Sequence, residues 1–441
     1  MKKVLIVISL LIVGAMGYYF SVGSQQATDE LKRYVDREIK ILEQNGFVIE
    51  DRVVEERGEH FVINYADPIK IAHYLKSKNV DISLEDSAEF KGVKIASDIK
   101  YLDGIYSAIS SDIYPIAFPE NLMRDVTPQD RKILDKILKD QIFLIHTDIN
   151  KLFNSFRGYI KDINTTIESE DPLSIVSQGF KFKGDFDRDR LKSSSNSIEK
   201  ISLHAKSGSR ILLERLDGSY KQDRDSTYDY TSGYKIDHIS YGDGREIRST
   251  LKDIEVKSSG ESRKGLMFTK FDLQIGSADI KEPRGEHLLE KIKSKIAIDN
   301  IAIEALEKMS RLDENDTKGF DRSFRDLLSK GIKLTIDELS VQKIKESNKA
   351  DKIDGFDINA TAQIDKSADF NKIEQNPLYL LSVIDSTLNI ELSNKLYILL
   401  QREPELTLLS LMFQPTIKKD KVIFDIVYKN GSLKINGKPI L

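Results

Sequence analysis

Beyond Gly46 the chain repeatedly alternates apolar with polar side chains, and this period of two constrains its fold more than any other feature. Residues 271–275 place Phe, Leu and Ile at every second position, and residues 358–364 repeat the pattern with Ile and Ala. Because successive side chains of a strand point to opposite faces, each such segment builds a sheet with one apolar and one wet face. The alternation predicts an α+β fold that is β-rich and dominated by large antiparallel sheet.

Turn residues join some of these strands into hairpins. Arg57-Gly58 lies between two short apolar runs, and Asn430-Gly431 joins residues 424–428 to residues 433–435. The Asn-Gly dipeptide tolerates the positive φ angles that a tight type I′ turn requires. Both places are therefore predicted to connect antiparallel neighbours.

Short helices are expected between the strands. Residues 28–44 form one, which stops at Gly46 and packs its apolar face on the chain's own globular part or, alternatively, on a partner helix or the membrane surface. Thr127-Pro128 opens a second helix that runs to about residue 140, and residues 286–293 have the apolar spacing of a third. A strand also leads into a short apolar helix at three similar places, residues 64–75, 300–309 and 389–400. These β-then-α units indicate either a stacked or duplicated architecture or a coincidence.

The longest uncharged stretch lies at the N-terminus. Residues 4–28 contain no charged side chain, and a span of about 20 apolar residues matches a hydrocarbon layer about 30 Å thick. Lys2 and Lys3 precede it, which keeps the N-terminus in the cytoplasm. We interpret residues 1–23 as a short cytoplasmic tail and a transmembrane anchor. The alternative is a cleaved signal peptide ending near Ala15-Met16-Gly17, and both interpretations export the rest of the chain.

Composition narrows what the exported part can be. The 40% of apolar residues can supply a core, and a net charge of -4 excludes the strongly basic balance of a general nucleic-acid binder. The absence of cysteine excludes disulfide frameworks, thiolate metal sites and cysteine nucleophiles. With 441 residues the chain can hold two or three domains, or one large β-architecture. We divide it into an amphipathic helix with a mixed α/β part, residues 24–190, and a β-rich part, residues 191–441.

No catalytic, cofactor or metal site is predicted, and we expect no enzyme. The histidines are scattered and none has the spacing of a helical zinc site: His60, His73, His146, His204, His238 and His287. Asp185, Asp187 and Asp189 alternate as in a calcium loop. Arg190 and Asn196, however, stand where that loop needs a glycine and a bidentate Glu.

Tyrosines gather in one polar segment: Tyr220, Tyr228, Tyr230, Tyr234 and Tyr241. Aromatic residues are common in strands, so a strand pair explains the cluster. The alternative is a stacking groove in a periplasmic glycan hydrolase, which would also require a pair of carboxylates.

Four Asn-x-Ser/Thr sites lie in the exported part, and three of them carry an aspartate two positions earlier. These three are Asn164, Asn315 and Asn359. The extended Asp-x-Asn-x-Thr pattern resembles the acceptor site of a bacterial N-glycosylation system, which makes these asparagines candidate glycan sites.

A lone N-terminal span and an amphipathic helix precede a β-rich body that holds two apolar segments, "DNIAIEALEKM" and "LNIELSNKLYILL". The chain closes on "YKNGSLKINGKPIL". In these features it resembles the YdgA-like family of bacterial inner-membrane-anchored proteins. The resemblance implies a periplasmic body on an inner-membrane anchor, able to self-associate. A more distant similarity to AsmA-like envelope proteins implies a curved sheet whose apolar concave face could shelter acyl chains.

We therefore expect a single-pass inner-membrane protein of the bacterial cell envelope, with a cytoplasmic N-terminus and its bulk in the periplasm. Its expected role is that of a structural or binding component. The main alternative is a carrier of lipid or another hydrophobic ligand with an open apolar groove, and the two differ in whether that groove exists. Expected partners are the inner membrane, a second copy of the chain and lipid, with no nucleic acid and no cofactor.

Overall fold

The computed structural model confirms a β-rich fold with a large antiparallel sheet. It describes residues 28–77, 82–102, 107–124, 128–167, 172–187, 190–224, 226–283, 285–312, 316–346, 351–401 and 414–440. The chain divides into two compact units, Met1–Ser219 and Tyr220–Leu441. β11 (Ser209–Gln222) leads from one unit to the other, and the boundary predicted after residue 190 falls at the beginning of β10 (Arg190–Ala205).

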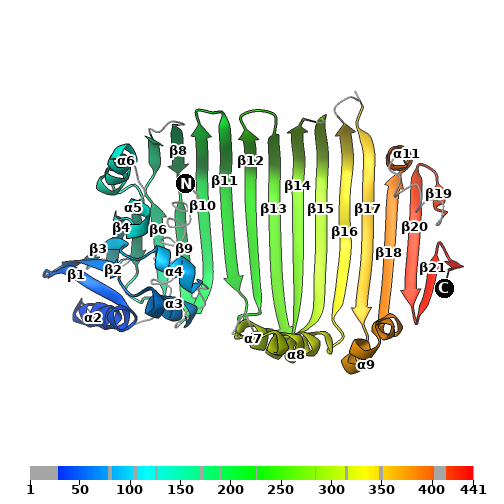
Figure 1. Cartoon of the computed structure of the whole chain (residues 1–441), viewed down its shortest axis with the longest axis horizontal. Coiled ribbons are helices and arrows are strands. Elements are labelled where there is room, and N and C mark those ends of the chain that lie inside the picture. The colour runs from blue at the N-terminus through cyan, green and yellow to red at the C-terminus, as the bar shows by residue number, and fades with distance from the viewer. Residues whose placement is uncertain are drawn as a thin grey trace. The chain divides into compact units, whose positions relative to one another are not determined.

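The first unit is an antiparallel meander in which successive strands pair in chain order (Figure 1). β6 and β7 act as one bent strand, which pairs with a second bent strand made of β8 and β9, and β10 pairs with both parts of the latter. The strands are β1 (Phe47–Val54), β2 (Gly58–Tyr65), β3 (Lys94–Tyr101), β4 (Ile109–Ala117), β5 (Ile145–Ile149), β6 (Ser155–Ile160), β7 (Ile163–Ile167), β8 (Leu173–Gln178), β9 (Lys181–Asp187) and β10.

The helix predicted after the N-terminal segment is confirmed as α2 (Thr28–Gln44). Val35 and Ile39 on its apolar face are buried in the core of the first unit, against Phe61 and Ile99. The face therefore packs on the chain's own globular part, as predicted. The other helices of this unit are α3 (Pro68–Ser77), α4 (Leu84–Glu89), α5 (Glu120–Arg124) and α6 (Pro128–Lys139), the last of which confirms the helix predicted after Thr127.

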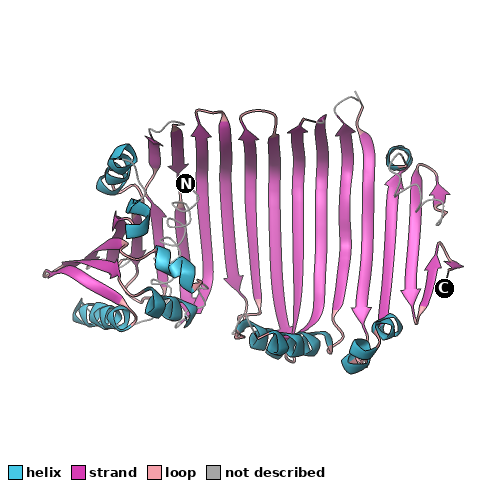
Figure 2. Cartoon of the chain, viewed as in Figure 1, coloured by secondary structure: helices cyan, strands magenta, loops and turns pink. Residues whose placement is uncertain are grey.

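The second unit is an antiparallel sheet of long strands (Figure 2). From β12 to β18 each strand pairs with the next, β18 pairs with β20, and β20 pairs with β19 near one end and β21 near the other. The strands are β12 (Tyr230–Asp243), β13 (Arg248–Arg263), β14 (Leu266–Glu282), β15 (Gly285–Ala302), β16 (Lys333–Glu346), β17 (Ile353–Ile364), β18 (Ile384–Ser393), β19 (Thr416–Lys418), β20 (Lys421–Lys429), β21 (Ser432–Ile435) and β22 (Lys438–Pro439).

Helices of the second unit lie in the connections at the ends of its strands (Figure 1). One end carries α7 (Ile303–Ser310), α8 (Thr317–Leu328), α9 (Phe370–Gln375), the 3-10 turn η1 (Pro377–Tyr379) and α10 (Leu380–Val383), and the opposite end carries α11 (Asn394–Leu400). Together with α3, the helices α7 and α11 confirm the three predicted transitions from strand to short helix.

The helix predicted over residues 286–293 is wrong, because these residues lie in β15. Leu289 pairs with Ala278 of β14, and Ile292 pairs with Ile275. Between these two pairs, one residue on each strand falls outside the pairing register. The skipped residue in β15 is Lys291, whose φ is +53°. A β-strand irregularity of this kind shifts the alternation by one residue. It produces the three-residue apolar spacing that resembles a turn of helix.

The same spacing occurs at aligned positions in every strand from β12 to β17. The apolar pairs are Ile236 and Ile239, Leu251 and Ile254, Ile275 and Ala278, Leu289 and Ile292, Val341 and Ile344, and Ile353 and Phe356. Asp253 has a φ of +54° at this position, and a Cβ on Gly355 would lie 1.9 Å from the Val341 carbonyl oxygen. The aligned irregularities keep apolar side chains on one face of the sheet along the whole length of the strands.

Both predicted hairpins are confirmed. Asn430 and Gly431 have φ angles of +51° and +75° in the connection between β20 and β21, as a type I′ turn requires. β1 and β2 pair across the turn that contains Arg57.

Candidate functional site: an open apolar sheet face

One face of the sheet in the second unit carries continuous rows of apolar side chains. Residues that pair directly across neighbouring strands share a face, so the register defines each row. The first row is Ile236, Ile254, Ile275, Ile292, Val341, Phe356, Leu392 and Val422. The second is Tyr234, Val256, Leu273, Ser294, Leu339, Ile358, Ile390 and Phe424. The third is Ser232, Ser258, Phe271, Ile296, Ile336, Ala360, Leu388 and Ile426.

We call these three rows, with Leu334 and Ile298 beside them, the apolar face. At about 4.8 Å between neighbouring strands, the rows run roughly 30 Å across the sheet from β12 to β20. Leu334 and Ile336 were not predicted to lie in a strand, although residues 333–337 carry the same alternation as the strands that were predicted. The register between strands, which turns separate segments into rows, is a property of the fold and was not predicted.

Among the described residues of the second unit, no second layer covers the middle of the apolar face. The helices of this unit lie at the strand ends, and none overlies the centres of β13 to β17 (Figure 2). Phe271 and Leu334 each remain 41% exposed and Tyr234 remains 46% exposed. Contiguous apolar surface of this kind marks an interaction site in a soluble domain.

One corner of the apolar face is covered by the helix α11, and the side chain of Val422 beneath it is less exposed than those in the uncovered middle. The ring of Tyr397 on α11 lies 6.2 Å from the ring of Phe424, so α11 packs over the end of β20. Leu396 of the same helix is 5% exposed and Val422 beneath it is 1% exposed. Exposure therefore varies over the apolar face: Val422 is buried beneath the helix, Ile254 and Val341 are 8% and 6% exposed among their neighbours in the sheet, and Phe271 and Tyr234 remain accessible.

The opposite face of the same sheet is polar and its charges are paired. Lys295 lies 2.8 Å and Lys293 lies 3.6 Å from Glu338 across β15 and β16, and Lys421 lies 2.5 Å from Glu391 across β18 and β20. The hydrogen bond from Lys295 is the main reason that the pKa of Glu338 is lowered. A hollow of about 610 Å³ on this face is lined mainly by polar residues that include Lys293, Glu338, Glu391 and Lys421. Because the ammonium and carboxylate groups neutralise one another, the hollow is a weaker candidate site than the apolar face.

The tyrosine cluster contributes to the apolar face. Tyr230 and Tyr234 stand on the apolar side of β12, where they pair with Gly260 and Val256. Tyr220 stacks on Tyr230 with its ring centroid 6.3 Å away. The cluster thus extends an apolar surface, as expected for aromatic residues in neighbouring strands.

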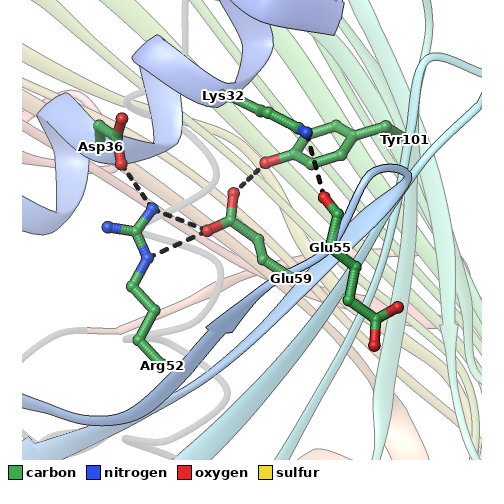
Figure 3. Close-up of polar contacts among 6 residues, drawn as sticks. All are labelled: Lys32, Asp36, Arg52, Glu55, Glu59 and Tyr101. Atoms are coloured by element: carbon green, nitrogen blue, oxygen red, sulfur yellow. Dashed lines mark hydrogen bonds and ion pairs between the residues drawn. The ribbon is translucent and has the colours of Figure 1, made fainter.

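A buried carboxylate ties α2 to the β1–β2 hairpin in the first unit (Figure 3). The Glu59 side chain is 0% exposed and accepts hydrogen bonds from Nε and Nη2 of Arg52, at 3.1 and 2.8 Å, and from the Tyr101 hydroxyl. Arg52 also contacts Asp36 of α2 at 2.5 Å, and the Lys32 ammonium lies 5.8 Å from the centre of the Tyr101 ring. Burial raises the pKa of Tyr101, and the hydrogen bond to Glu59 raises it further, so this hydroxyl remains a donor. The network fixes α2 on the first unit.

Two of the scattered histidines form a cross-strand row with aspartates on the first unit. Nδ1 of His60 lies 2.6 Å from Asp98, and Nδ1 of His146 lies 2.7 Å from Asp112. Asp98 and Asp112 pair across β3 and β4. Burial, together with the hydrogen bond to Asp98, raises the pKa of Tyr114 to about 12. Each imidazole has its own carboxylate, and no group of three or more metal-ligating side chains forms in the part of the chain that the structure describes.

Two of the three candidate glycan sites lie in strands. Asn164 is exposed in β7, and Asn359 is exposed in β17, where it donates a hydrogen bond of 2.8 Å to Asp357. Asn315 lies outside the described residues. Of the aspartates that resemble a calcium loop, Asp185 accepts a hydrogen bond of 2.7 Å from Ser193, and Asp189 also lies outside the described residues.

The predicted transmembrane anchor, residues 1–23, falls outside the described residues. Among the helices that are described, none combines the length and the apolar character needed to cross a bilayer.

No protein-family model matches the chain, and no curated protein or solved structure matches it either. The resemblance to the YdgA-like family therefore stays a prediction. We infer the function from the geometry of the apolar face.

Proposed function

We propose that the chain binds the acyl chains of membrane lipids on its apolar face and carries or shelters them beside a membrane. The observation that supports this is the uncovered set of apolar rows across β12 to β20, with Phe271 and Leu334 each 41% exposed. Burying apolar surface is favourable in proportion to its area, so each part of the face that an apolar ligand covers would stabilise the complex.

The composition of the face favours acyl chains over a protein partner. Between β14 and β20 the first and third rows contain only apolar side chains. Protein interfaces form about one hydrogen bond per 100–200 Å² of buried surface. A face that offers no side-chain donor or acceptor across two rows matches a ligand that has none, and the hydrocarbon part of a lipid is such a ligand.

The setting we propose is the periplasmic side of a bacterial inner membrane, with the N-terminal apolar segment as a single-pass anchor. The support is residues 4–28, which carry no charge, followed directly by α2. The Glu59 network then joins α2 to the first unit. The aligned strand irregularities increase local twist, which supports the curved, AsmA-like sheet that the resemblance implies. In this setting the chain is a lipid-binding component of the cell envelope.

The proposal is tested by the lipid that stays with the full-length protein. We would purify the chain from membranes, extract it with organic solvent and quantify phospholipid per protein. Leu334→Asp places a carboxylate on the apolar face, and because a charge against acyl chains costs several kcal/mol, we expect at least about a tenfold loss of bound lipid. The matched control is Thr335→Asp, which places the same charge on the opposite face one residue away.

Two results would contradict the proposal. One is a wild-type protein without bound lipid, and the other is equal retention by the Leu334→Asp and Thr335→Asp variants. If light scattering then shows a wild-type dimer that Leu334→Asp converts to a monomer, a second copy of the chain covers the face. The protein would in that case be a self-associating structural component.

A further inference from the structure

Exposed apolar side chains gather at one end of the sheet, in the connections that hold α8, η1 and α10 (Figure 1). Phe320 and Phe324 of α8 are 50% and 44% exposed. Leu378 of η1 and Leu381 of α10 are 71% and 50% exposed. We call these four side chains the apolar rim.

The helix α8 has the composition of a helix that lies on a membrane surface. The rings of Phe320 and Phe324 stack with centroids 6.2 Å apart and an interplanar angle of 7°, so the two rings form one apolar pair on α8. Exposed side chains of both charges lie on the same helix, and Ser323 is buried on the side that faces the rest of the unit: the charged residues are Lys318, Asp321, Arg322 and Asp326. A helix with aromatic residues on one side and charged residues elsewhere can bury its apolar side at the boundary of headgroups and acyl chains.

The apolar rim borders the apolar face at α10. The hydroxyl of Tyr428 in β20 donates a hydrogen bond of 2.6 Å to the carbonyl oxygen of Leu381. Tyr428 pairs with Ser386 two positions beyond the third row, on the same face of the sheet as that row. Leu381 therefore lies next to the end of the third row. Along the chain, α8 ends shortly before Leu334 at the beginning of β16.

We propose that this end of the sheet inserts its apolar rim into the surface of a phospholipid bilayer, and that acyl chains pass there between the bilayer and the apolar face. The proposal rests on the proposed function, since it assigns the place where that ligand enters. The occupant is a bilayer rather than a protein because the rim exposes rings and leucines and borders a face whose first and third rows, from β14 to β20, carry no side-chain hydrogen-bonding group.

The natural absence of cysteine gives a direct test of contact. In the full-length protein reconstituted in phosphatidylcholine vesicles, Phe324→Cys and Asp326→Cys would each carry one environment-sensitive fluorophore. Asp326 is exposed on the same helix but two residues away, so its side chain points in a different direction. We expect a blue-shifted emission and protection from aqueous iodide at position 324 only. Equal quenching at both positions would overturn the proposal.

Transfer of lipid provides the second readout. The double variant Phe320→Glu with Phe324→Glu should slow transfer of a fluorescent phospholipid between vesicles at least about tenfold, because insertion of even one ring contributes more than a tenfold step in affinity. The double variant Arg322→Glu with Asp326→Glu changes the net charge by the same amount at exposed positions that point away from the rings, and it should leave the rate unchanged. Circular dichroism verifies that both variants fold.

Lipid retention separates this inference from the proposed function. If the Phe320→Glu, Phe324→Glu variant retains extracted lipid like the wild type but transfers it slowly, both proposals are supported. If retention is normal and transfer is also normal, the entry site is overturned while the binding function stands. If the wild type retains no lipid at all, the binding function fails, and transfer through this end fails with it.

Discussion

At the scale of single residues, the first unit depends on a buried charge that nothing in the sequence singles out. Glu59 is 0% exposed, and its oxygens are reached by Arg52 of the preceding strand and Tyr101 of a more distant one. A buried carboxylate is tolerated only when it is paired and hydrogen-bonded. No spacing pattern marks Asp36, Arg52, Glu59 and Tyr101 as partners, because they come from four elements that meet only when β1, β2 and β3 pair and α2 packs on them. The sequence therefore predicted the helix at this place but not the contacts that hold it.

Replacing the Tyr101 hydroxyl tests this network. Tyr101→Phe leaves the ring in place but removes one donor from a carboxylate that has no access to water, so we expect a loss of about 1–3 kcal/mol in the free energy of unfolding. Chemical denaturation followed by circular dichroism measures it. Tyr159→Phe is the control, since Tyr159 is 44% exposed and its hydroxyl can bond to water. Equal stability of the two variants would show that Glu59 does not depend on Tyr101.

At the scale of elements, the strands were predictable where the alternation is regular and were missed where it is interrupted. Residues 358–364 keep a strict period of two and lie in β17 as predicted. Residues 286–293 contain the irregularity at Lys291, and their apolar spacing of three indicated a helix. A single strand cannot reveal such an interruption. The same spacing in the neighbouring strands, at Leu251 with Ile254 and at Val341 with Ile344, is the signal that could have identified it.

The paired charges on the polar face predict an acid-dependent stability of the sheet. The pKa of Glu338 is lowered, chiefly by the hydrogen bond from Lys295. A lowered pKa in the folded state means that the pair stabilises the fold above the ordinary carboxyl pKa of about 4.3, and that this stability is lost as the pH falls through the lowered value. In the Glu338→Gln variant the free energy of unfolding should therefore depend less on pH below about pH 5. At neutral pH it should be lower than in the wild type by about 0.5 kcal/mol.

Denaturation midpoints measured at a series of pH values test this prediction. Lys295→Gln removes the partner instead of the carboxyl group and should flatten the same part of the profile, because it returns the pKa of Glu338 toward its ordinary value. An unchanged pH profile in both variants would mean that the ion pair does not contribute to folding.

At the scale of the whole molecule, alternation shows that a sheet has an apolar face but does not show what covers that face. The strands β13 to β17 would show the same alternation of apolar and polar residues in a sandwich with a second layer and in an open sheet. The difference arises from where the helices lie, and here α7, α8, α9 and α10 are at the strand ends (Figure 1). The lipid carrier, an alternative in the sequence analysis, is for this reason the function that the geometry supports best.

An open apolar face should make the stability of the second unit depend on its ligand. A ligand that binds only the folded state stabilises it by mass action, and the gain appears in the segment that contacts the ligand. We expect phospholipid loading to slow amide hydrogen exchange in β13 to β17 and to leave β2 to β5 of the first unit unchanged. Mass spectrometry of the full-length protein, with lipid and after delipidation, measures both units in one sample. Lipid loading should slow amide exchange in β13 to β17 of the Thr335→Asp variant but not of the Leu334→Asp variant. Equal slowing of exchange in both units would contradict binding on the apolar face.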